Sequence, residues 1–425
     1  MSTRNSWRRA SGAVASAVTG LLLFGATATP VHAASTRSQQ WHLDAMHAED
    51  MWRTSTGKGI TVAVIDTGVD PDNPDLKGRV LDGKDLAPSS RSGDEHTDYD
   101  GHGTGMAGLI AGTGAYDGGN GAFGLAPGAK ILPVRMPADS DTNGFAGPSY
   151  FSKAIRYAAD AGAEVINISM GGRLNSPQLT AAVKYALDHG SLVFAAVGND
   201  GGKGNPVEYP AATPGVVGVA AVGKNLRGTA ESESGSQVDM AAPGEDMVHA
   251  CGGETGLCRS HGTSDATALA SASAALIWSK HPTWTNNQVL RVLLNTIGAP
   301  TDGAKRNDSI GYGIVRPRIA LQDPGDPGAA GTYPLPDFQD SASPSSGAVA
   351  PKNSAARDKE GKEYKRGNGA TEVSSDEDGG NGLGMGLGTG VVVVLGAVIA
   401  VATISAIRRR RTSAALPPPP ADARE

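Results

Sequence analysis

The stretch VAVIDTG, residues 62–68, has the pattern of a buried strand that ends in a carboxylate and a sharp turn. An uninterrupted apolar run precedes Asp66, and Gly68 allows the backbone to turn directly after it. We therefore expect Asp66 at the carboxyl end of a central strand. That edge of an α/β sheet is where functional sites form.

Short apolar runs alternate with helical stretches on both sides of this strand. The runs lie at residues 60–65, 130–134, 164–168, 191–196 and 216–221, and helical stretches lie at 150–161 and 176–189. This alternation predicts an α/β fold whose mainly parallel central sheet carries helices on both faces. Residues 34–322 are long enough for one large domain with a single core.

Two further motifs follow in the chain, DGHGT at residues 100–104 and HGTS at 261–264. A serine hydroxyl is a poor nucleophile near neutral pH, so it needs a histidine to accept its proton and a carboxylate to orient the imidazole. Asp66, His102 and Ser264 supply these groups in an order used by one class of peptide-bond hydrolases. Each also has a plain alternative, namely a strand-end acid, a satisfied histidine and a helix-capping serine.

A fourth group is required because the tetrahedral intermediate carries an oxyanion. Asn199 lies in the stretch FAAVGNDG, residues 194–201, where an apolar strand ends among glycines. Its amide is a candidate oxyanion donor together with the backbone N–H of Ser264, and losing such a donor costs about 2.7–4 kcal/mol. A simple turn is the alternative for this sequence.

Together these motifs resemble those of the subtilisin-like serine proteases over residues 40–320. The resemblance implies a subtilisin-like fold, with Asp66, His102 and Ser264 as the catalytic triad and Asn199 as the oxyanion donor. It implies a serine endopeptidase that acts through an acyl-enzyme intermediate on polypeptide substrates.

The resemblance also implies that an extended peptide substrate pairs with two strand edges. The first edge lies in the stretch INISMGG, residues 166–172. The six residues expected to line the two edges are Ser169, Met170 and Gly171 on one side and Gly144, Phe145 and Ala146 on the other. A plain strand or loop is the alternative for either segment.

A narrower similarity rests on residues 40–52, on the exported domain and on a C-terminal anchor. These features are similar to the mycosins, which are membrane-anchored subtilases associated with type VII secretion in actinobacteria. This similarity implies a secretion-system membrane complex as a partner. Residues 34–59 are too few for a folded prodomain, so we expect an N-terminal arm packed along the catalytic domain.

Two positions differ from the usual family pattern, which has an apolar residue directly after the nucleophile and a proline three positions further on. This chain has Asp265 and Ala268 there. A carboxylate in the first helical turn suits the helix dipole, but it brings negative charge near the oxyanion. A catalytically weak or silent subtilase-fold module with a structural role in a secretion complex is therefore the alternative function.

Both ends of the chain indicate membrane targeting. Residues 1–33 have a basic start, an apolar stretch and a VHA cleavage site, which predicts a secretory signal peptide, with an uncleaved anchor as the alternative. Residues 384–407 carry no charge and precede four arginines, which predicts a transmembrane helix and a cytoplasmic tail at 408–425. The peptidase domain would then lie outside the cell on a single-pass anchor.

Residues 323–383 are rich in proline, glycine, serine and mixed charge, which predicts a disordered linker, with a cell-wall spacer as the alternative. The net charge of −6 gives no basic surface suited to nucleic acid. In an exported region, Cys251 and Cys258 favour a local disulfide.

No cluster of potential ligands requires a metal, and we expect no cofactor. The acidic segment at residues 94–100 matches no calcium loop known to us, so a solvated loop is favoured there over a calcium site.

Overall fold

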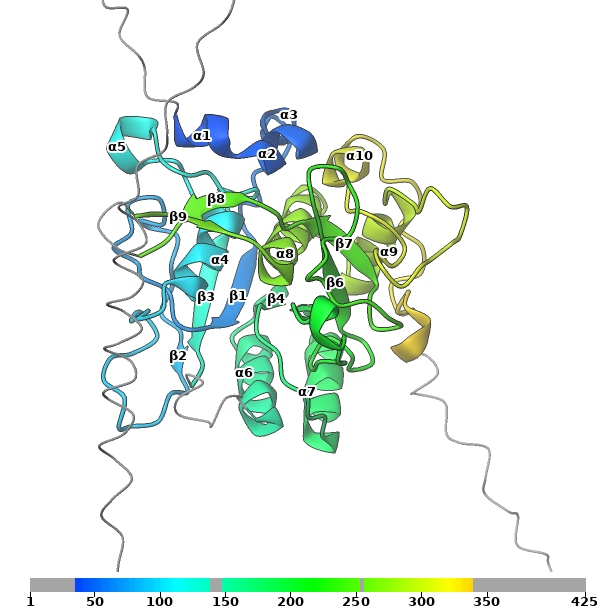
Figure 1. Ribbon diagram of the computed structural model, residues 1–425, viewed down its shortest axis with the longest axis horizontal. Helices are drawn as coiled ribbons and strands as arrows, with labels where there is room; N and C mark the ends of the chain where they lie inside the picture. The colour runs from blue at the N-terminus through cyan, green and yellow to red at the C-terminus, as the bar shows by residue number, and fades with distance from the viewer. Residues whose placement is uncertain (1–34, 138–146, 253–255, 339–425) are drawn as a thin grey trace, which may run out of the picture. The chain divides into compact units, whose positions relative to one another are not determined.

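The computed structural model describes residues 35–137, 147–252 and 256–338 (Figure 1). Its main sheet has the strand order β2-β3-β1-β4-β5-β6-β7, and all neighbouring strands run parallel. The strands of this sheet are β1 Thr61–Asp66, β2 Lys84–Asp85, β3 Lys130–Arg135, β4 Val165–Ile168, β5 Leu192–Ala196, β6 Val217–Val222 and β7 Met240–Pro243. The predicted α/β fold with a parallel central sheet is confirmed.

A second, smaller sheet follows the last strand of the main sheet in the chain. It is an antiparallel hairpin of β8, Met247–Ala250, and β9, Leu257–Ser260. The sequence analysis did not predict this hairpin, nor strands β2 and β7, because each is four residues or shorter and lacks a long apolar or alternating pattern.

Helices cover the sheet in two groups. Helix α4 packs against α8, and α6 packs against α7, each pair alongside the central strands (Figure 1). The helices of the described residues are α1 Thr36–Gln39, α2 Trp41–Met46, α3 Ala48–Trp52, α4 His102–Ala111, α5 Tyr116–Gly119, α6 Pro148–Asp160, α7 Pro177–Asp188, α8 Thr263–Lys280, α9 Asn286–Asn295 and α10 Pro317–Gln322, with a 3₁₀ turn η2 at Gly201–Lys203. Helices α6 and α7 confirm the two predicted helical stretches.

Helix α8 is the central helix of the fold. It is buried without interruption from Thr263 to Trp278, and it contacts strands β1, β4, β5, β6 and β7. Small alanine and serine side chains around the whole helix permit this close approach, because they offer no polar face that must remain in water. The packing fixes the N-terminal end of α8, and Ser264 with it.

The predicted N-terminal arm is present and packs against the domain. Gln40 is fully buried, and its Nε2 donates to the carbonyl oxygens of Phe123 and Val248 at 2.8 and 3.0 Å. Leu43 and Met51 join the core, each 2% exposed or less. The arm is therefore part of the folded unit.

The predicted linker begins too early. Tyr333 and Leu335 are buried at 6% and 0% exposure, and the Tyr333 hydroxyl donates to the carbonyl of Gly215 at 2.7 Å. The segment after α10 has few apolar residues. Tyr333 and Leu335 are nevertheless buried, and the segment shows no helical or strand periodicity from which the sequence would reveal this burial. The folded part therefore extends at least to residue 338 rather than ending at 322.

Some predictions lie outside the described residues. They are the signal peptide at 1–33, the second substrate edge at Gly144, Phe145 and Ala146, most of the linker, the membrane span at 384–407 and the tail at 408–425. Among residues 35–137, 147–252 and 256–338, no helix combines the length and apolar character that a bilayer span requires.

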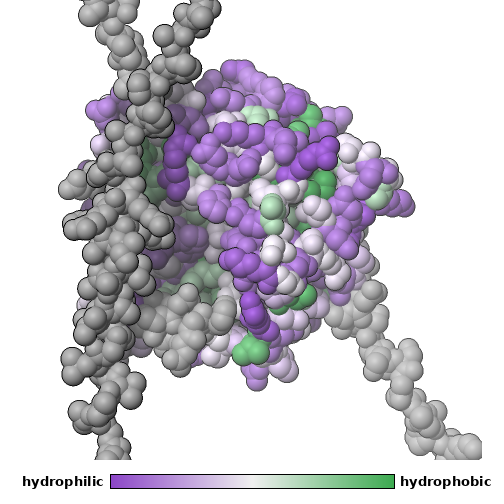
Figure 2. Space-filling view, in the orientation of Figure 1, coloured by the Kyte–Doolittle hydropathy of each residue, from purple (hydrophilic) through white to green (hydrophobic). Residues whose placement is uncertain are grey.

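Figure 2 shows one face of the molecule, on which hydrophobic residues are scattered among hydrophilic ones. Large apolar side chains that remain exposed include Leu174 at 69% and Tyr99 at 61%. Single exposed residues of this kind are ordinary on a folded protein and do not by themselves indicate an interface.

Candidate active site

Asp66 and His102 meet at the carboxyl end of β1. Asp66 is the last residue of that strand and is fully buried, and His102 is the first residue of α4. His102 Nδ1 lies 2.7 Å from Asp66 Oδ1, which also accepts the backbone N–H of Thr67 at 2.8 Å. This contact holds the imidazole with its other nitrogen directed away from the carboxylate.

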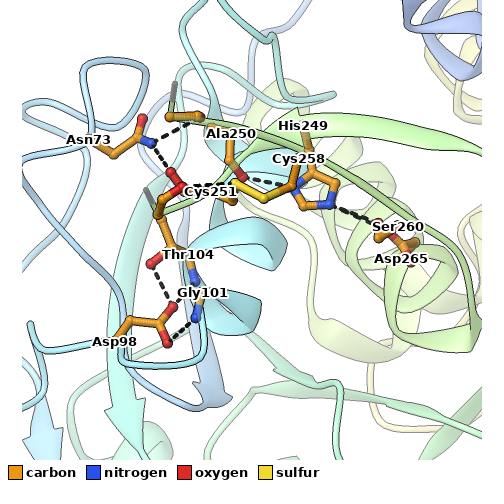
Figure 3. The surroundings of a disulfide bond; sticks show 12 residues. Asn73, Asp98, Gly101, Thr104, His249, Ala250, Cys251, Cys258, Ser260 and Asp265 are labelled. Atoms are coloured by element: carbon orange, nitrogen blue, oxygen red, sulfur yellow. Dashed lines mark hydrogen bonds and ion pairs between the residues drawn. A yellow bond between two sulfur atoms is a disulfide. The ribbon is translucent and has the colours of Figure 1, made fainter. Parts of the chain in front are cut away.

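The loop before His102 is fixed by Asp98, which the sequence analysis assigned to a solvated segment. Asp98 Oδ2 accepts the backbone N–H and the hydroxyl of Thr104 at 2.8 and 2.7 Å, while Oδ1 accepts the N–H of Gly101 at 2.8 Å (Figure 3). Gly101 has a φ of 85°, a conformation that glycine adopts without strain. Asp98 thus satisfies free amides at the start of α4 and orients His102. An acid six residues before Thr104 is the sequence feature that could have indicated this role of Asp98.

Ser264 is the second residue of α8 and is 9% exposed. Its hydroxyl donates to the carbonyl of Ser169 at 3.1 Å, and the Ser169 hydroxyl donates to the carbonyl of Ser264 at 3.2 Å. The two serines therefore bind each other directly. In this resting arrangement the Ser264 proton is directed to Ser169 and not to His102.

Asn199 lies opposite the start of α8. Its side-chain Oδ1 accepts the backbone N–H and the hydroxyl of Thr263 at 2.9 and 3.1 Å. With the oxygen held in this way, Nδ2 is the group left to donate a hydrogen bond. An amide donor beside the nucleophile is the arrangement that stabilises an oxyanion.

These groups share one cleft of about 630 Å³. His102, Asn199 and Ser264 line it, together with the predicted edge residues Ser169, Met170 and Gly171. Asp66 stands behind His102, outside the lining. Of the ten predicted catalytic and substrate-binding residues, the seven that the structure describes thus gather at this cleft.

The electrostatic surroundings of His102 favour its charged form. Burial lowers the pKa of the imidazole, but the charge of Asp66 and the hydrogen bond to it raise it more, with additional contributions from Asp265 and Asp100. The pKa of His102 is raised to about 9. An imidazolium cannot accept a proton, so His102 can act as a base only in its neutral form.

Asp265, the residue that differs from the family pattern, faces away from the cleft. It is 1% exposed, and Ser260 Oγ donates to its Oδ1 (Figure 3). His249 Nε2 lies 2.7 Å from the same Ser260 oxygen, and its Nδ1 lies 2.7 Å from the carbonyl of Ala250. Burial raises the pKa of Asp265 and lowers that of His249. The side chain therefore does not turn toward the position of the oxyanion.

The hairpin that carries this network also holds the predicted disulfide. Cys251 and Cys258 are bonded to each other, with their Cα atoms 5.7 Å apart (Figure 3). Asn73 Nδ2 donates to the carbonyl of Cys251 at 2.7 Å. The bridge closes the hairpin beside the starts of α4 and α8.

Sequence analysis missed a group of acids on the wall of the cleft. Asp200 and Glu208 line the cleft, and Glu233 is fully buried behind them. Burial, followed by the charge of Glu208, raises the pKa of Glu233 to about 7. Burial and the charge of Asp200 also raise the pKa of Glu208. Asp200 lies in the stretch at residues 194–201, but no local motif connects it with Glu208 and Glu233, because separate loops bring the three acids together.

Within the described parts of the chain, no group of three or more histidine, cysteine or acidic side chains is arranged to hold a metal ion. The acidic segment at residues 94–100 uses Asp98 for backbone amides. Asp94 likewise accepts the N–H of His96 at 3.0 Å.

Several solved structures and characterised proteins are similar to this chain. MycP1 from Mycobacterium smegmatis superimposes with a TM-score of 0.58 and 28% sequence identity, covering 69% of this chain and 87% of that one. MycP3, described as a protease from the type VII (ESX-3) secretion system, gives a TM-score of 0.56 and 34% identity over 66% of this chain and 87% of that one. The expected similarity to mycosins is confirmed.

Subtilisin E of Bacillus subtilis (strain 168) is 38% identical over 236 residues, which are 55% of this chain and 59% of that protein. The chain thus spans about six-tenths of the length of this relative. The model of the Subtilase family matches residues 57–313, which include all four predicted catalytic residues and more than half of the chain. The chain therefore belongs to the subtilase family.

Proposed function

We propose that this protein is a serine endopeptidase that hydrolyses peptide bonds through an acyl-enzyme intermediate. The observation that carries the proposal is the cleft in which His102, bonded to Asp66 at 2.7 Å, lies with Ser264 and Asn199. Similarity to subtilisin E and to the MycP3 protease supports the same activity.

In this mechanism neutral His102, oriented by Asp66, takes the proton of Ser264 as the hydroxyl attacks the peptide carbonyl. The Ser264 hydroxyl must first leave the carbonyl of Ser169. Asn199 Nδ2 and the backbone N–H of Ser264 stabilise the oxyanion. His102 then gives its proton to the leaving amine, and water hydrolyses the acyl-enzyme.

The test is active-site labelling of the full-length protein with a fluorophosphonate probe. Wild-type protein should be labelled, and Ser264→Ala should not. Ser279→Ala is a matched control on the same helix, because the Ser279 hydroxyl donates to the carbonyl of Lys58, away from the cleft. Labelling that persists in Ser264→Ala would remove Ser264 as the nucleophile.

The second candidate is a catalytically weak or silent module with a structural role in a secretion complex. Two observations favour it. The Ser264 hydroxyl donates to the carbonyl of Ser169, which is not a base, and the raised pKa of His102 favours the imidazolium, which cannot take the serine proton. Absence of labelling across pH 7 to 10 in a folded wild-type protein would establish this candidate over the first.

We also propose that the protein is exported and held at the cell membrane by residues 384–407, in association with type VII secretion. The uncharged run before four arginines supports the anchor. The solved MycP1 and MycP3 structures, the latter named for a type VII system, support the association. Deleting residues 384–407 should release the protein from carbonate-washed membranes, whereas a release that is equal with and without the deletion would exclude this anchor.

A further inference from the structure

The lining of the cleft carries both cationic and acidic side chains. The cationic residues are Arg91 and Arg135, whose guanidinium lies 5.6 Å from the centre of the Tyr99 ring. Asp100 lines the cleft beside His102. On the side of Asn199 it is lined by Asp200 and Glu208. An extended substrate therefore meets a field that differs along its length.

Glu208 is brought to the cleft by a short pairing of two loops. Gly172 and Tyr209 exchange both backbone hydrogen bonds, at 2.8 and 2.7 Å. The pairing sets Glu208 against Gly171, so closely that a methyl group on Gly171 would collide with Glu208 Oε2. The half-buried carboxylate thus forms part of the wall beside the predicted substrate edge.

We expect Asp200 and Glu208 to lie on the acyl side of the reaction centre. His102 must face the leaving amine in order to protonate it, whereas Asn199 and Ser264 act on the carbonyl. Asp200 follows Asn199 directly, and Gly171 lies two residues after Ser169, whose carbonyl accepts from Ser264. We therefore expect the side chain of the residue before the scissile bond to enter between these segments.

A further carboxylate stands behind this wall. Glu233 is fully buried, and its Oε1 accepts the N–H of Asp200 at 3.4 Å. Its Oε2 has no hydrogen-bond partner among the described residues. A buried carboxyl oxygen without a partner is costly, and a cation nearby would lower that cost.

The cations already present do not complete this acidic group. Arg173 and Lys203 approach Asp200 at 3.5 and 3.3 Å, but their side chains are 54% and 80% exposed. They lie at the surface, where such pairs contribute little. Neither makes a salt bridge with Glu208 within 4 Å in the described structure.

From these observations we propose that Glu208, with Asp200, selects substrates that carry arginine or lysine immediately before the scissile bond. A guanidinium in this pocket would form charge-assisted hydrogen bonds with the Glu208 carboxylate, out of bulk water. This inference rests on the proposed peptidase activity, and it assigns the substrate class that the sequence left open.

The test compares two fluorogenic peptides that differ only in arginine or citrulline before the scissile bond. Citrulline has the shape of arginine without its charge. Wild-type protein should show a kcat/KM at least about tenfold higher for arginine, the range of a charge-assisted hydrogen bond. Glu208→Gln should bring the ratio near one through a loss of kcat/KM for the arginine peptide.

Two further variants test whether the effect depends on charge at the pocket itself. Asp188→Asn removes one negative charge at the exposed end of α7, where Asp188 pairs with Lys184, and it should leave the ratio unchanged. Arg173→Ala removes the competing surface cation beside Asp200 and should raise the ratio. These two results, no change for Asp188→Asn and a higher ratio for Arg173→Ala, are expected if only charges close to the pocket affect the ratio.

Fluorophosphonate labelling of every variant separates this inference from the proposed function. If all variants are labelled but the ratio is near one in wild type, or is unaffected by Glu208→Gln, the basic-residue preference is wrong and the peptidase activity stands. If folded wild-type protein is not labelled, the proposed function fails, and the inference fails with it. Cleavage-site mapping on a peptide library should independently return products that end in arginine or lysine.

Discussion

Two buried carboxyl groups near the candidate active site are held in opposite ways: Asp265 follows Ser264 in the chain, and Glu233 contacts Asp200, which follows Asn199. Asp265 receives the Ser260 hydroxyl, which in turn contacts His249. Glu233 has one oxygen on the N–H of Asp200 and leaves the other without a hydrogen-bond partner in the described structure. The two acids are 1% and 0% exposed. Burial alone therefore does not decide what a carboxyl contributes, since its partners determine whether its charge is balanced.

The two carboxyl groups therefore differ in what they leave for a ligand, since Asp265 lies outside the lining of the cleft and Glu233 lies behind Asp200 and Glu208, which line it. On the side of Asp265, side chains within the fold satisfy each other and leave nothing for a substrate to complete. On the side of Glu233 and Glu208, negative charge remains incompletely compensated next to an open cleft.

The largest effect on activity is expected from substitution of Asp66, which has one oxygen with a hydrogen-bond partner and one without. Its Oδ1 holds His102, and its Oδ2 is buried without a hydrogen-bond partner in the described structure. Asp66→Asn should lower kcat by about 10⁴-fold, because an amide no longer fixes the required imidazole tautomer. Steady-state peptide hydrolysis measures the loss, with the thermal melting curve as the check on folding. A loss below about tenfold would show that Asp66 does not orient the base.

The next effect is a gain in stability from Glu233→Gln. The pKa of Glu233 is raised from 4.5 to about 7 in the folded state, so ionisation costs the wild-type fold stability as pH rises between those values. The variant should be more stable by about 2–3 kcal/mol above pH 7 and by nothing below pH 4.5. Urea unfolding at pH 4.5 and pH 8 tests this, and an equal effect at both pH values would contradict it. Gln can keep the bond to the N–H of Asp200.

The smallest effect is expected from Asp265→Asn. Asp265 contributes to raising the pKa of His102, which is about 9, and His102 can act as a base only when neutral. The pH at which kcat/KM reaches half its maximum should therefore lie near 9 in wild type. It should fall in the variant by less than about one pH unit.

A pH–rate profile from pH 6 to 10 measures this shift, and Asp188→Asn again serves as the remote charge control. The asparagine can still accept from Ser260, so the fold should be kept. A midpoint that moves upward or stays fixed would show that Asp265 does not act on His102.

Sequence patterns predicted the parts of the molecule that local chemistry determines. Strand β1 ends at Asp66 because an apolar run is followed by a turn, and Ser264 begins a helix because the alanine-rich run after it can be buried on all sides. The disulfide was predicted from two cysteines in a region that we expect to be exported, and the structure pairs them.

The remainder depends on contacts between distant segments. Glu208 gains its place only because its loop pairs with Gly172, and Glu233 is fixed by its contact with Asp200. Tyr333 is buried at the end of a proline- and glycine-rich segment whose composition predicted a linker. Neither composition nor periodicity encodes such contacts, because they arise only once the sheet is assembled.

The N-terminal arm has a consequence for maturation by proteolysis. Gln40 also accepts the N–H of Phe123 through its Oε1, at 3.0 Å, so one side chain is joined to three backbone groups in two distant segments. Leu43 and Met51 would become exposed if the arm departed. A cut between the arm and β1 would therefore leave a nicked protein with the arm still bound. We therefore expect that such a cut alone does not release the arm, because its hydrogen bonds and buried side chains do not depend on the connection to β1.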